Sequence, residues 1–487
     1  MIIASLFILI LVAIAGSLIC QVEKRVRIMA GIFSTAVAGL IFYIVSPSFF
    51  GQSIQVGNWW LIDGFSAIMA SLVAILYLTA TWVSVRYIGH ERHEGIVTDI
   101  DVKVYFALLH LFVMSMLVVV LTNHALILWL ALEATTLSST FLVGLYRKKT
   151  SIEAAWKYIV ICSTGITLGL LGILMLGYGT HLVNELVQTS FLLSDLLSNA
   201  SLIPDKLAKW AFVFIFVGFG AKVGYVPTHT WLPDAHSKAP SPISALFSGI
   251  LLNVALYAII RFQMITNKSL GGNEWTSSFF LIFGALSVLL PAFMMLIQKN
   301  YKRMLAYSSI EHMGLISLAL SIPPIGTIAA VMHMTGHALV KSSLFFGAGE
   351  VLLLKKSTDT DKVRGLLKEA PFTAILFLLG ILSIVAVPPS LLFVSEYMML
   401  TAFIKTHLIL TIILFAALGA IAYAMLRVTL GMLISENDNK SAVLEKEKWN
   451  STQTIIALQL SMVAIMTIWF SAPIGQEFLQ AVVKNII

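Results

Sequence analysis

Seven ionisable side chains stand in segments that are otherwise strongly apolar, and they are the residues most able to do chemistry. They are Glu133, Lys222, Glu311, His333, His337, Lys341 and Glu396. A charged side chain at the centre of a bilayer costs about 2.5–3.5 kcal/mol on insertion scales. Such residues are retained where they pair, line water or carry charge. We therefore start from the hypothesis that this set exchanges protons.

Glu133 and Lys222 form the first candidate pair. Burial in hydrocarbon disfavours the charged form of either group, and contact between them favours both charges. A small movement of one partner would then change how readily the other binds a proton. Lys222 stands five residues before Pro227, where a helix break would leave carbonyls and water within reach. The alternative is a static ion pair that only fixes the register of two helices.

His333, His337 and Lys341 follow one another at steps of four residues. This spacing puts them on one helix face, about 6 Å apart. Histidine titrates near neutral pH, so the row suits a water-bridged proton relay, and Glu396 after Pro388 would be its exit group. The alternatives are packed core histidines and a carboxylate that caps a half-helix. The histidine spacing could also bind a metal, but no carboxylate stands beside it in the sequence, and we expect no metal.

Two more positions are candidate accessories to this relay. Glu311 stands next to His312, and tuning and structural roles fit it equally well. His229 lies in a polar loop that also holds His236 and Lys238. This loop could be the inner proton entrance, although a solvated turn is an equal alternative.

The composition indicates a polytopic membrane protein. Of 487 residues, 59% are hydrophobic and 11% are charged, against roughly 25% charged in a soluble domain. The two cysteines are isolated, so neither a disulfide framework nor a metal-ligand spacing exists. A phosphate-binding glycine loop is also absent. We therefore expect no cofactor in this chain, and any redox chemistry would belong to other subunits.

Fourteen apolar segments are each long enough to cross the hydrocarbon core, which takes about 20 residues. The first segment lacks the features of a cleaved signal peptide, and we interpret it as a retained helix. The segments lie near 3–20, 28–46, 61–85, 104–122, 124–145, 156–182, 208–227, 242–264, 277–297, 303–321, 324–353, 371–404, 408–433 and 453–475.

The distribution of basic residues supports an even number of spans. With both termini outside, twenty-three of the 31 Lys and Arg residues fall on the inner side and six, Arg261 among them, on the outer side. Such a bias is the usual signature of the cytoplasmic side. It also accounts for most of the net charge of +7, so nucleic acid is not an expected partner, and the lipid bilayer is.

The order of features predicts an all-α fold with two related halves. Spans five and ten carry a central acidic residue, and spans seven and twelve are interrupted by proline. Because five spans is an odd number, consecutive units must insert with opposite orientations, which is an architecture of transporters. We predict helices one to three over 1–103, an inverted repeat over 104–264, a second over 277–433, and a last helix over 453–475.

Five segments carry a resemblance to a known family. They read LWLALEATT, GFGAKVGYVPTHTWLPDAHSKAPSPISALFSGILL, NYKRMLAYSSIEHMG, MHMTGHALVKSSLFFGAG and VPPSLLFVSEY. With them the chain resembles the antiporter-like subunits of respiratory complex I, of Mrp cation antiporters and of group 4 [NiFe] hydrogenases. The run from EATTLSST through SSIEHMG is most similar to hydrogenase-4 component F.

The resemblance implies a fourteen-helix subunit with two inverted five-helix repeats and broken helices seven and twelve. It implies that Glu133 and Lys222 are the conserved pair, Lys341 the central lysine and Glu396 the terminal ionisable group. Family members hold no redox cofactor and pump protons while neighbouring membrane and peripheral subunits transfer electrons. The implied location is the inner (plasma) membrane of a prokaryote. One position departs from the pattern, because span eight has Asn253 where the family commonly has Lys or His, so a continuous relay would need water there.

The most concrete hypothesis is therefore a proton-translocating subunit of a hydrogenase-4 or formate hydrogenlyase type oxidoreductase, related to NADH-quinone oxidoreductase. A subunit of a multi-subunit Na+/H+ antiporter is the alternative, and the same residues would serve it. A purely structural membrane anchor is a third possibility, which leaves the buried charges unexplained.

Overall fold

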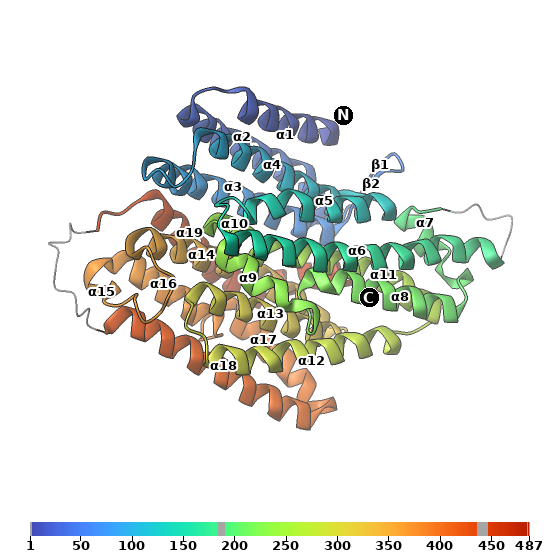
Figure 1. Ribbon diagram of the computed structural model, residues 1–487. Helices are drawn as coiled ribbons and strands as arrows, with labels where there is room; N and C mark the ends of the chain where they lie inside the picture. The colour runs from blue at the N-terminus through green and yellow to red at the C-terminus, as the bar shows by residue number, and fades with distance from the viewer. Residues whose placement is uncertain (1, 184–189, 436–446, 485, 487) are drawn as a thin grey trace.

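Long helices running side by side build almost the whole molecule (Figure 1). The computed structural model describes residues 2–183, 190–435, 447–484 and 486. The first half of the chain contains α1 (Ile2–Ile19), α2 (Glu23–Val45), α3 (Gly64–His93), α4 (Asp99–Leu121), α5 (Ala125–Val143), α6 (Lys149–Val183), α7 (Leu193–Ser198), α8 (Asp205–Val223), α9 (Trp231–Lys238), α10 (Ser241–Leu246) and α11 (Leu252–Leu270).

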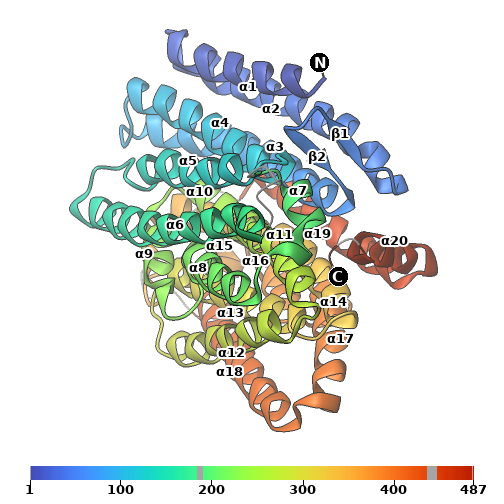
Figure 2. The same ribbon diagram turned by 90° about the vertical axis from the view of Figure 1, so that its right-hand side faces the viewer.

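The second half is also built of long helices, and α12 and α18 lie on the side of the molecule opposite to α1 and α2 in both views (Figure 2). A two-stranded hairpin, β1 (Ile54–Val56) with β2 (Trp60–Ile62), precedes α3. The second half contains α12 (Glu274–Leu296), α13 (Tyr301–Leu320), α14 (Ile325–Lys355), α15 (Leu366–Glu369), α16 (Pro371–Ile384), α17 (Leu391–Thr406), α18 (Leu408–Ile434), α19 (Ser451–Ser471) and α20 (Pro473–Lys484).

Every predicted span coincides with a helix or with a broken helix pair. Among the described residues, twelve helices are long and apolar enough to cross a membrane. The difference from fourteen has two causes. Helix α13 is made more polar by Lys302, Arg303 and Glu311, and the twelfth span is divided into α16 and α17.

The two predicted breaks are present, and each is built by local chemistry. Helix α8 ends at Val223 because Gly224 takes the left-handed conformation that glycine tolerates best. The indole of Trp231 donates to the carbonyl of Ala221, 2.9 Å away, and so satisfies one of the exposed helix-end carbonyls. In the second half, the side chain of Ser390 caps the start of α17 by accepting from the amide of Leu392.

Helices α6 and α8 pack closely, and this packing places side chains of α6 next to Lys222 on α8. A Cβ added to Gly165 would lie 2.6 Å from the carbonyl oxygen of Gly218, so the two backbones touch at this point. Small residues allow such approaches between helices in membranes. The consequence is that side chains from both helices reach the same buried volume.

Several features outside the predicted spans were not predicted. The hairpin β1–β2 is short, and α3 continues to His93, eight residues beyond the predicted end of its span. Helix α20 buries Leu479, Val482 and Val483, and it packs against α3 and α19. Twelve residues are too few to cross a bilayer, so a search for spans does not find this helix.

Candidate functional site

Lys222 is fully buried near the carboxyl end of α8. Helix α8 stops one residue later, and the partial negative charge of a helix end favours a cation there. The ammonium donates to Thr136 Oγ1 on α5, at 2.5 Å, and to the hydroxyl of Tyr158 on α6, at 3.0 Å. Two neutral oxygens from two helices therefore hold this lysine.

Glu133 belongs to the same cluster but forms no ion pair with Lys222 among the described residues. Its Oε1 accepts from the hydroxyl of Ser163 on α6, at 2.6 Å. Its Oε2 is buried and has no hydrogen-bond partner. Thr136, which holds Lys222, lies one helical turn after Glu133 on α5. The predicted pair thus lies in one cluster without direct contact, and among the described residues Glu133 Oε2 has no hydrogen-bond partner.

Lys341 on α14 is held in a similar way in the second half. It is fully buried, donates to the carbonyl of Leu305 at 2.7 Å, and is bonded to the hydroxyl of Ser308. Both partners belong to α13, one to two turns before Glu311. As in the first half, a hydroxyl one turn away from the glutamate holds the lysine.

A chain of polar side chains crosses three helices beside Lys341. His312 Nε2 lies 3.3 Å from Glu311 Oε2, and His312 Nδ1 lies 2.9 Å from His333 Nε2. His333 Nδ1 in turn lies 2.9 Å from the hydroxyl of Ser395 on α17, next to Glu396. We call these four residues, Glu311, His312, His333 and Ser395, the histidine chain. His312 was not among the predicted relay residues, and its place beside Glu311 was the signal that could have found it.

His337 and Lys341 share a face of α14 with His333, as the spacing predicts. The hydrogen bond of His333 goes across to His312, however, and not along the helix. Neither ring nitrogen of His337 has a hydrogen-bond partner, and its ring lies 5.3 Å from that of His312. His337 therefore stands between Lys341 and the histidine chain without a direct bond to either.

One group of side chains has the chemistry of a metal site. His312, His333 and Glu396 offer ligand atoms that all lie within 4.8 Å of one another. A carboxylate thus does approach the histidines, although it is distant in the sequence. Both ring nitrogens of His312 and His333 already face Glu311, each other or Ser395. Hydrogen bonds therefore join His312 to His333 and His333 to Ser395, and Glu311 lies against the far side of His312.

Asn253 lies where the two halves meet. Its amide donates to the carbonyls of Gly249, at 3.0 Å, and Met334, at 3.3 Å, and so ties α11 to α14. Its Oδ1 is buried without a hydrogen-bond partner and could accept from a water molecule. Nearby, the hydroxyls of Ser248 and Ser309 lie 2.6 Å apart and join the π-helical turn Phe247–Leu251 to α13.

The loop predicted as a possible entrance is partly buried between the two halves, and Lys238 at its end is half-exposed. His229 is buried with an unpartnered Nδ1. His236 is fully buried, and its ring lies 5.1 Å from that of Phe345 on α14. Asp234 pairs with Lys157 at 3.1 Å and with Arg303 at 2.5 Å. The loop therefore links α6 to α13.

A buried ion pair lies away from these clusters. It joins Asp63, the residue before α3, to Arg261 on α11. Both lie far from the loops rich in Lys and Arg, which we call the basic side of the molecule. Arg261 donates to both oxygens of Asp63 at 2.7 Å, and to the hydroxyl of Ser66 at 2.8 Å. Arg261 is thus buried and paired, which its count among the outer basic residues did not indicate. Burial alone would raise the pKa of Asp63, but the charge and hydrogen bonds of Arg261 lower that pKa to about 2.

Sequence comparison identifies the family to which these features belong. Residues 122–422, which contain every residue named in both clusters, match the family described as "NADH:quinone oxidoreductase/Mrp antiporter, TM". The chain belongs to this family. It is 34% identical over 380 residues to a protein named hydrogenase-4 component F homolog from Methylacidiphilum infernorum, covering 77% of this chain and 80% of that protein.

Solved structures share the whole fold of this antiporter-like subunit. One is a chain of the membrane-bound sulfane sulfur reductase, an archaeal respiratory membrane complex. It matches with a TM-score of 0.83 at 24% identity, covering 100% of this chain and 96% of that chain. A chain of the Mrp complex from Dietzia sp. DQ12-45-1b matches with a TM-score of 0.83 at 18% identity, covering 99% and 96%. The fold is therefore that of antiporter-like subunits in multi-subunit membrane complexes.

Proposed function

We propose that this subunit translocates protons across the membrane while partner subunits of a hydrogenase-4 or formate hydrogenlyase type complex transfer electrons. Family membership supports the class of protein. The buried lysines and the histidine chain support the proton as the ion, because imidazoles in hydrogen-bond contact pass protons by exchanging donor and acceptor roles. The histidine chain is the observation that carries the proposal.

In this proposal Lys222 is the input of the first half. Its ammonium is held by Thr136 and Tyr158, and Glu133 keeps one oxygen free. A conformational change that turns the free oxygen of Glu133 toward Lys222 would favour the charged lysine. The reverse movement would favour release of its proton toward the second half.

Lys341 and the histidine chain are the output. A proton that leaves Lys341 reaches His337 one turn earlier on α14, and His337 faces His312. From His312 the proton passes through His333 to Ser395 and Glu396 at the end of the chain. Water beside the free Oδ1 of Asn253 would complete the connection between the halves.

We further propose that the side of the molecule rich in Lys and Arg faces the cytoplasm of a prokaryote, with both termini outside. The charge bias of the loops supports this orientation. Labelling of single cysteines placed at each terminus, in intact cells and in broken membranes, tests it. Labelling of both termini by an impermeant reagent in intact cells is expected.

The test of proton translocation uses vesicles that carry the complete complex. Lys222→Ala and Lys341→Ala should each abolish proton uptake while the complex still assembles and its partners still transfer electrons. Lys268→Ala removes an exposed lysine at the far end of α11 and should leave proton uptake unchanged. Full proton uptake in either buried-lysine variant would refute the proposal.

A second candidate function is supported by the match to the Mrp complex chain. In that case the subunit would exchange Na+ for protons. Measurement of radioactive sodium flux in the same vesicles separates the two functions. Sodium flux that is lost with Lys341→Ala would favour the antiporter.

A further inference from the structure

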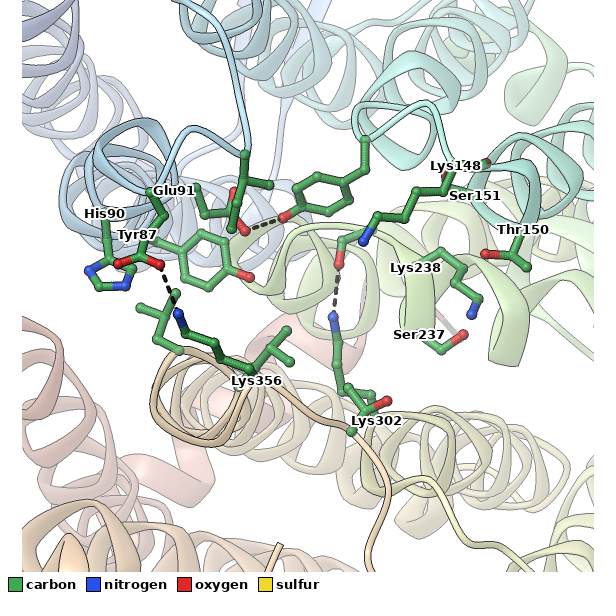
Figure 3. A pocket seen from close by; sticks show the side chains of 17 residues that line it. Tyr87, His90, Glu91, Lys148, Thr150, Ser151, Ser237, Lys238, Lys302 and Lys356 are labelled. Carbon is green, nitrogen blue, oxygen red and sulfur yellow. Dashed lines mark hydrogen bonds and ion pairs between the residues drawn. The ribbon is translucent and has the colours of Figure 1, made fainter. Parts of the chain in front are cut away.

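A cavity of about 380 Å³ opens on the basic side of the molecule, between α3, the start of α6, the end of α9 and the end of α14. Figure 3 shows side chains from these elements pointing into it. Its rim carries Lys148, Lys238 and His90, together with Lys356, whose ammonium pairs with Glu94 at 2.8 Å. We call it the basic-side vestibule. Its volume is large enough for several water molecules.

A carboxylate is buried at the inner end of this vestibule. Glu91 is 4% exposed, and its Oε1 accepts from the hydroxyl of Tyr146 at 2.6 Å. Among the described residues, its Oε2 has no hydrogen-bond partner, and neither has the hydroxyl of Tyr87 or of Ser241. Ser241 and Tyr87 lie side by side, since a Cβ on Gly349 would touch both. Buried polar oxygens beside an open cavity are the surroundings in which proteins hold ordered water.

Lys302 faces the same vestibule from α13 (Figure 3). It is 1% exposed, and its ammonium donates to the carbonyl of Ala239 at 2.8 Å. No ion pair joins Lys302 to Glu91 among the described residues. The lysine and the carboxylate thus share a cavity wall without neutralising each other through direct contact.

The vestibule leads toward Lys341. Lys302 lies one turn before Leu305, whose carbonyl accepts from Lys341. Its partner Ala239 is three residues after His236, which is buried with two unpartnered ring nitrogens. The ring of His236 packs against Phe345, one turn after Lys341 on α14. Lys302 and His236 therefore occupy the space between the vestibule and the central lysine.

We infer that Glu91 is the residue that takes up protons from the basic side. A proton from vestibule water adds to the free Oε2 of Glu91, while Oε1 keeps its bond to Tyr146. The proton then leaves to water beside Lys302 and moves past His236 to Lys341, and the Glu91 carboxylate is restored. This inference rests on the proposed proton translocation and names the uptake group that it requires.

The surroundings of Glu91 distinguish it from the other acidic residue of the vestibule. Glu94 lies on the rim and is held by Lys356, so its carboxylate is occupied and exposed. The hydrogen bond from Tyr146 fixes the orientation of the Glu91 carboxylate, and its Oε2 has no hydrogen-bond partner among the described residues. The titratable groups that share the vestibule with Glu91 are Tyr87, His90, Glu94, Tyr146, Lys148, Lys238, Lys302 and Lys356.

The test compares Glu91→Gln with Glu94→Gln in vesicles carrying the complete complex. Glutamine keeps an oxygen that can accept from Tyr146 but cannot bind the transported proton. We expect Glu91→Gln to slow proton uptake by on the order of tenfold or more, since loss of a positioned acid–base group has effects of that size. Glu94→Gln should leave the rate unchanged. Normal uptake in Glu91→Gln, with uptake abolished in Lys341→Ala, would overturn this inference and leave the proposed function standing.

A pH profile separates proton uptake from a structural role of Glu91. The rate of proton uptake in Glu91→Gln should fall more steeply as the pH on the basic side rises, because the variant lacks the group that collects scarce protons. Glu91→Asp, which restores a carboxylate, should recover the rate at low pH. An unaltered pH profile in Glu91→Gln, or no recovery with Asp in a complex that assembles normally, would overturn the inference. Normal uptake in Lys341→Ala would instead refute the proposed function.

Discussion

The two halves of this molecule hold their buried lysines in similar ways but differ in what lies next to them. Lys222 and Lys341 each bond to a hydroxyl one turn from a glutamate, and in the described part of the chain neither lysine forms an ion pair with that glutamate. Beside Lys341, hydrogen bonds continue through two histidines to α17. Beside Lys222, the bonds end at Tyr158 and Ser139, which lie 2.9 Å apart.

Under the proposed function, this difference would give the two halves distinct tasks. A lysine surrounded by hydroxyls and a partly free carboxylate can change its affinity for a proton when one neighbour moves. A row of imidazoles can pass a proton on without large movement. The first half is therefore suited to switching and the second to conduction. The predictions below test that division from the largest expected effect to the smallest.

Asp63 and Arg261 form a buried ion pair by direct contact. They are therefore a reference for Glu133 and Lys222, which lie in one cluster without such contact. Replacing Asp63 with Asn leaves the guanidinium without its charge partner, which costs about 3–5 kcal/mol in comparable pairs. We expect a large drop in the free energy of unfolding, measured by thermal or denaturant unfolding in detergent. Glu133→Gln should change stability far less, because Glu133 has no ion pair to lose. Equal losses in the two variants would contradict the division into paired and unpaired charges.

The same ion pair predicts a sensitivity to acid. Because Arg261 lowers the pKa of Asp63 to about 2, below its usual 3.8, the pair stabilises the fold fully above the unfolded pKa. This stabilisation is lost as the pH falls from about 4 toward 2. The unfolding temperature of the unmodified protein should fall over this range, and Asp63→Asn should show a smaller fall. Parallel curves for the two proteins would contradict the assignment.

The histidine chain gives the next largest effect. His333→Leu removes the bonds to both His312 and Ser395, and we expect proton uptake to fall on the order of 100-fold, which is typical for loss of a proton-transfer group. His337→Leu removes a ring that has no hydrogen bond and should cost less. Vesicles with the assembled complex measure both. A larger loss for His337→Leu would mean that conduction follows the face of α14 and not the cross-helix chain.

The hydroxyls that hold the lysines should differ in importance. Tyr158→Phe leaves Lys222 with the rotatable hydroxyl of Thr136, whereas Ser308→Ala leaves Lys341 with the fixed carbonyl of Leu305. A hydrogen bond to a charged group contributes about 1.5–3 kcal/mol. We expect proton uptake to fall about tenfold in Tyr158→Phe and less in Ser308→Ala. The reverse order would place the switch in the second half.

The sequence predicted what depends on hydropathy and on local breakers. Fourteen spans, the break after Lys222 and the break before Glu396 follow from apolar length and from proline. The hairpin and α20 were missed because they are too short to carry a span signal. Glu91 was placed with the loop that follows span three, since its charged neighbours mask the continuation of α3.

Contacts between helices could not be predicted from spacing. The row on α14 is real, but the partner of His333 comes from α13, and only the packing of α13 on α14 shows this. The ion pair of Arg261 could not be predicted because its partner Asp63 is 198 residues away in the sequence. The hydrogen bond from Ser163 to Glu133 could not be predicted either, since one serine among many apolar residues gives no sequence signal.

Ser163 provides the most sensitive test of the switch. Among the described residues, its hydroxyl is the hydrogen-bond partner of Glu133. A hydrogen bond to a charged group contributes about 1.5–3 kcal/mol. In Ser163→Ala the carboxylate is free to turn toward Lys222, which would hold the lysine charged and slow each cycle. Because water can replace Ser163 as a hydrogen-bond donor to Glu133, we expect only part of that energy to be lost. Proton uptake should therefore be roughly threefold slower. Ser163→Thr keeps the hydroxyl and should restore the rate. A Ser163→Ala complex that pumps at the normal rate would mean that Glu133 does not move during the cycle, and the first half would then be a static cluster like Asp63 and Arg261.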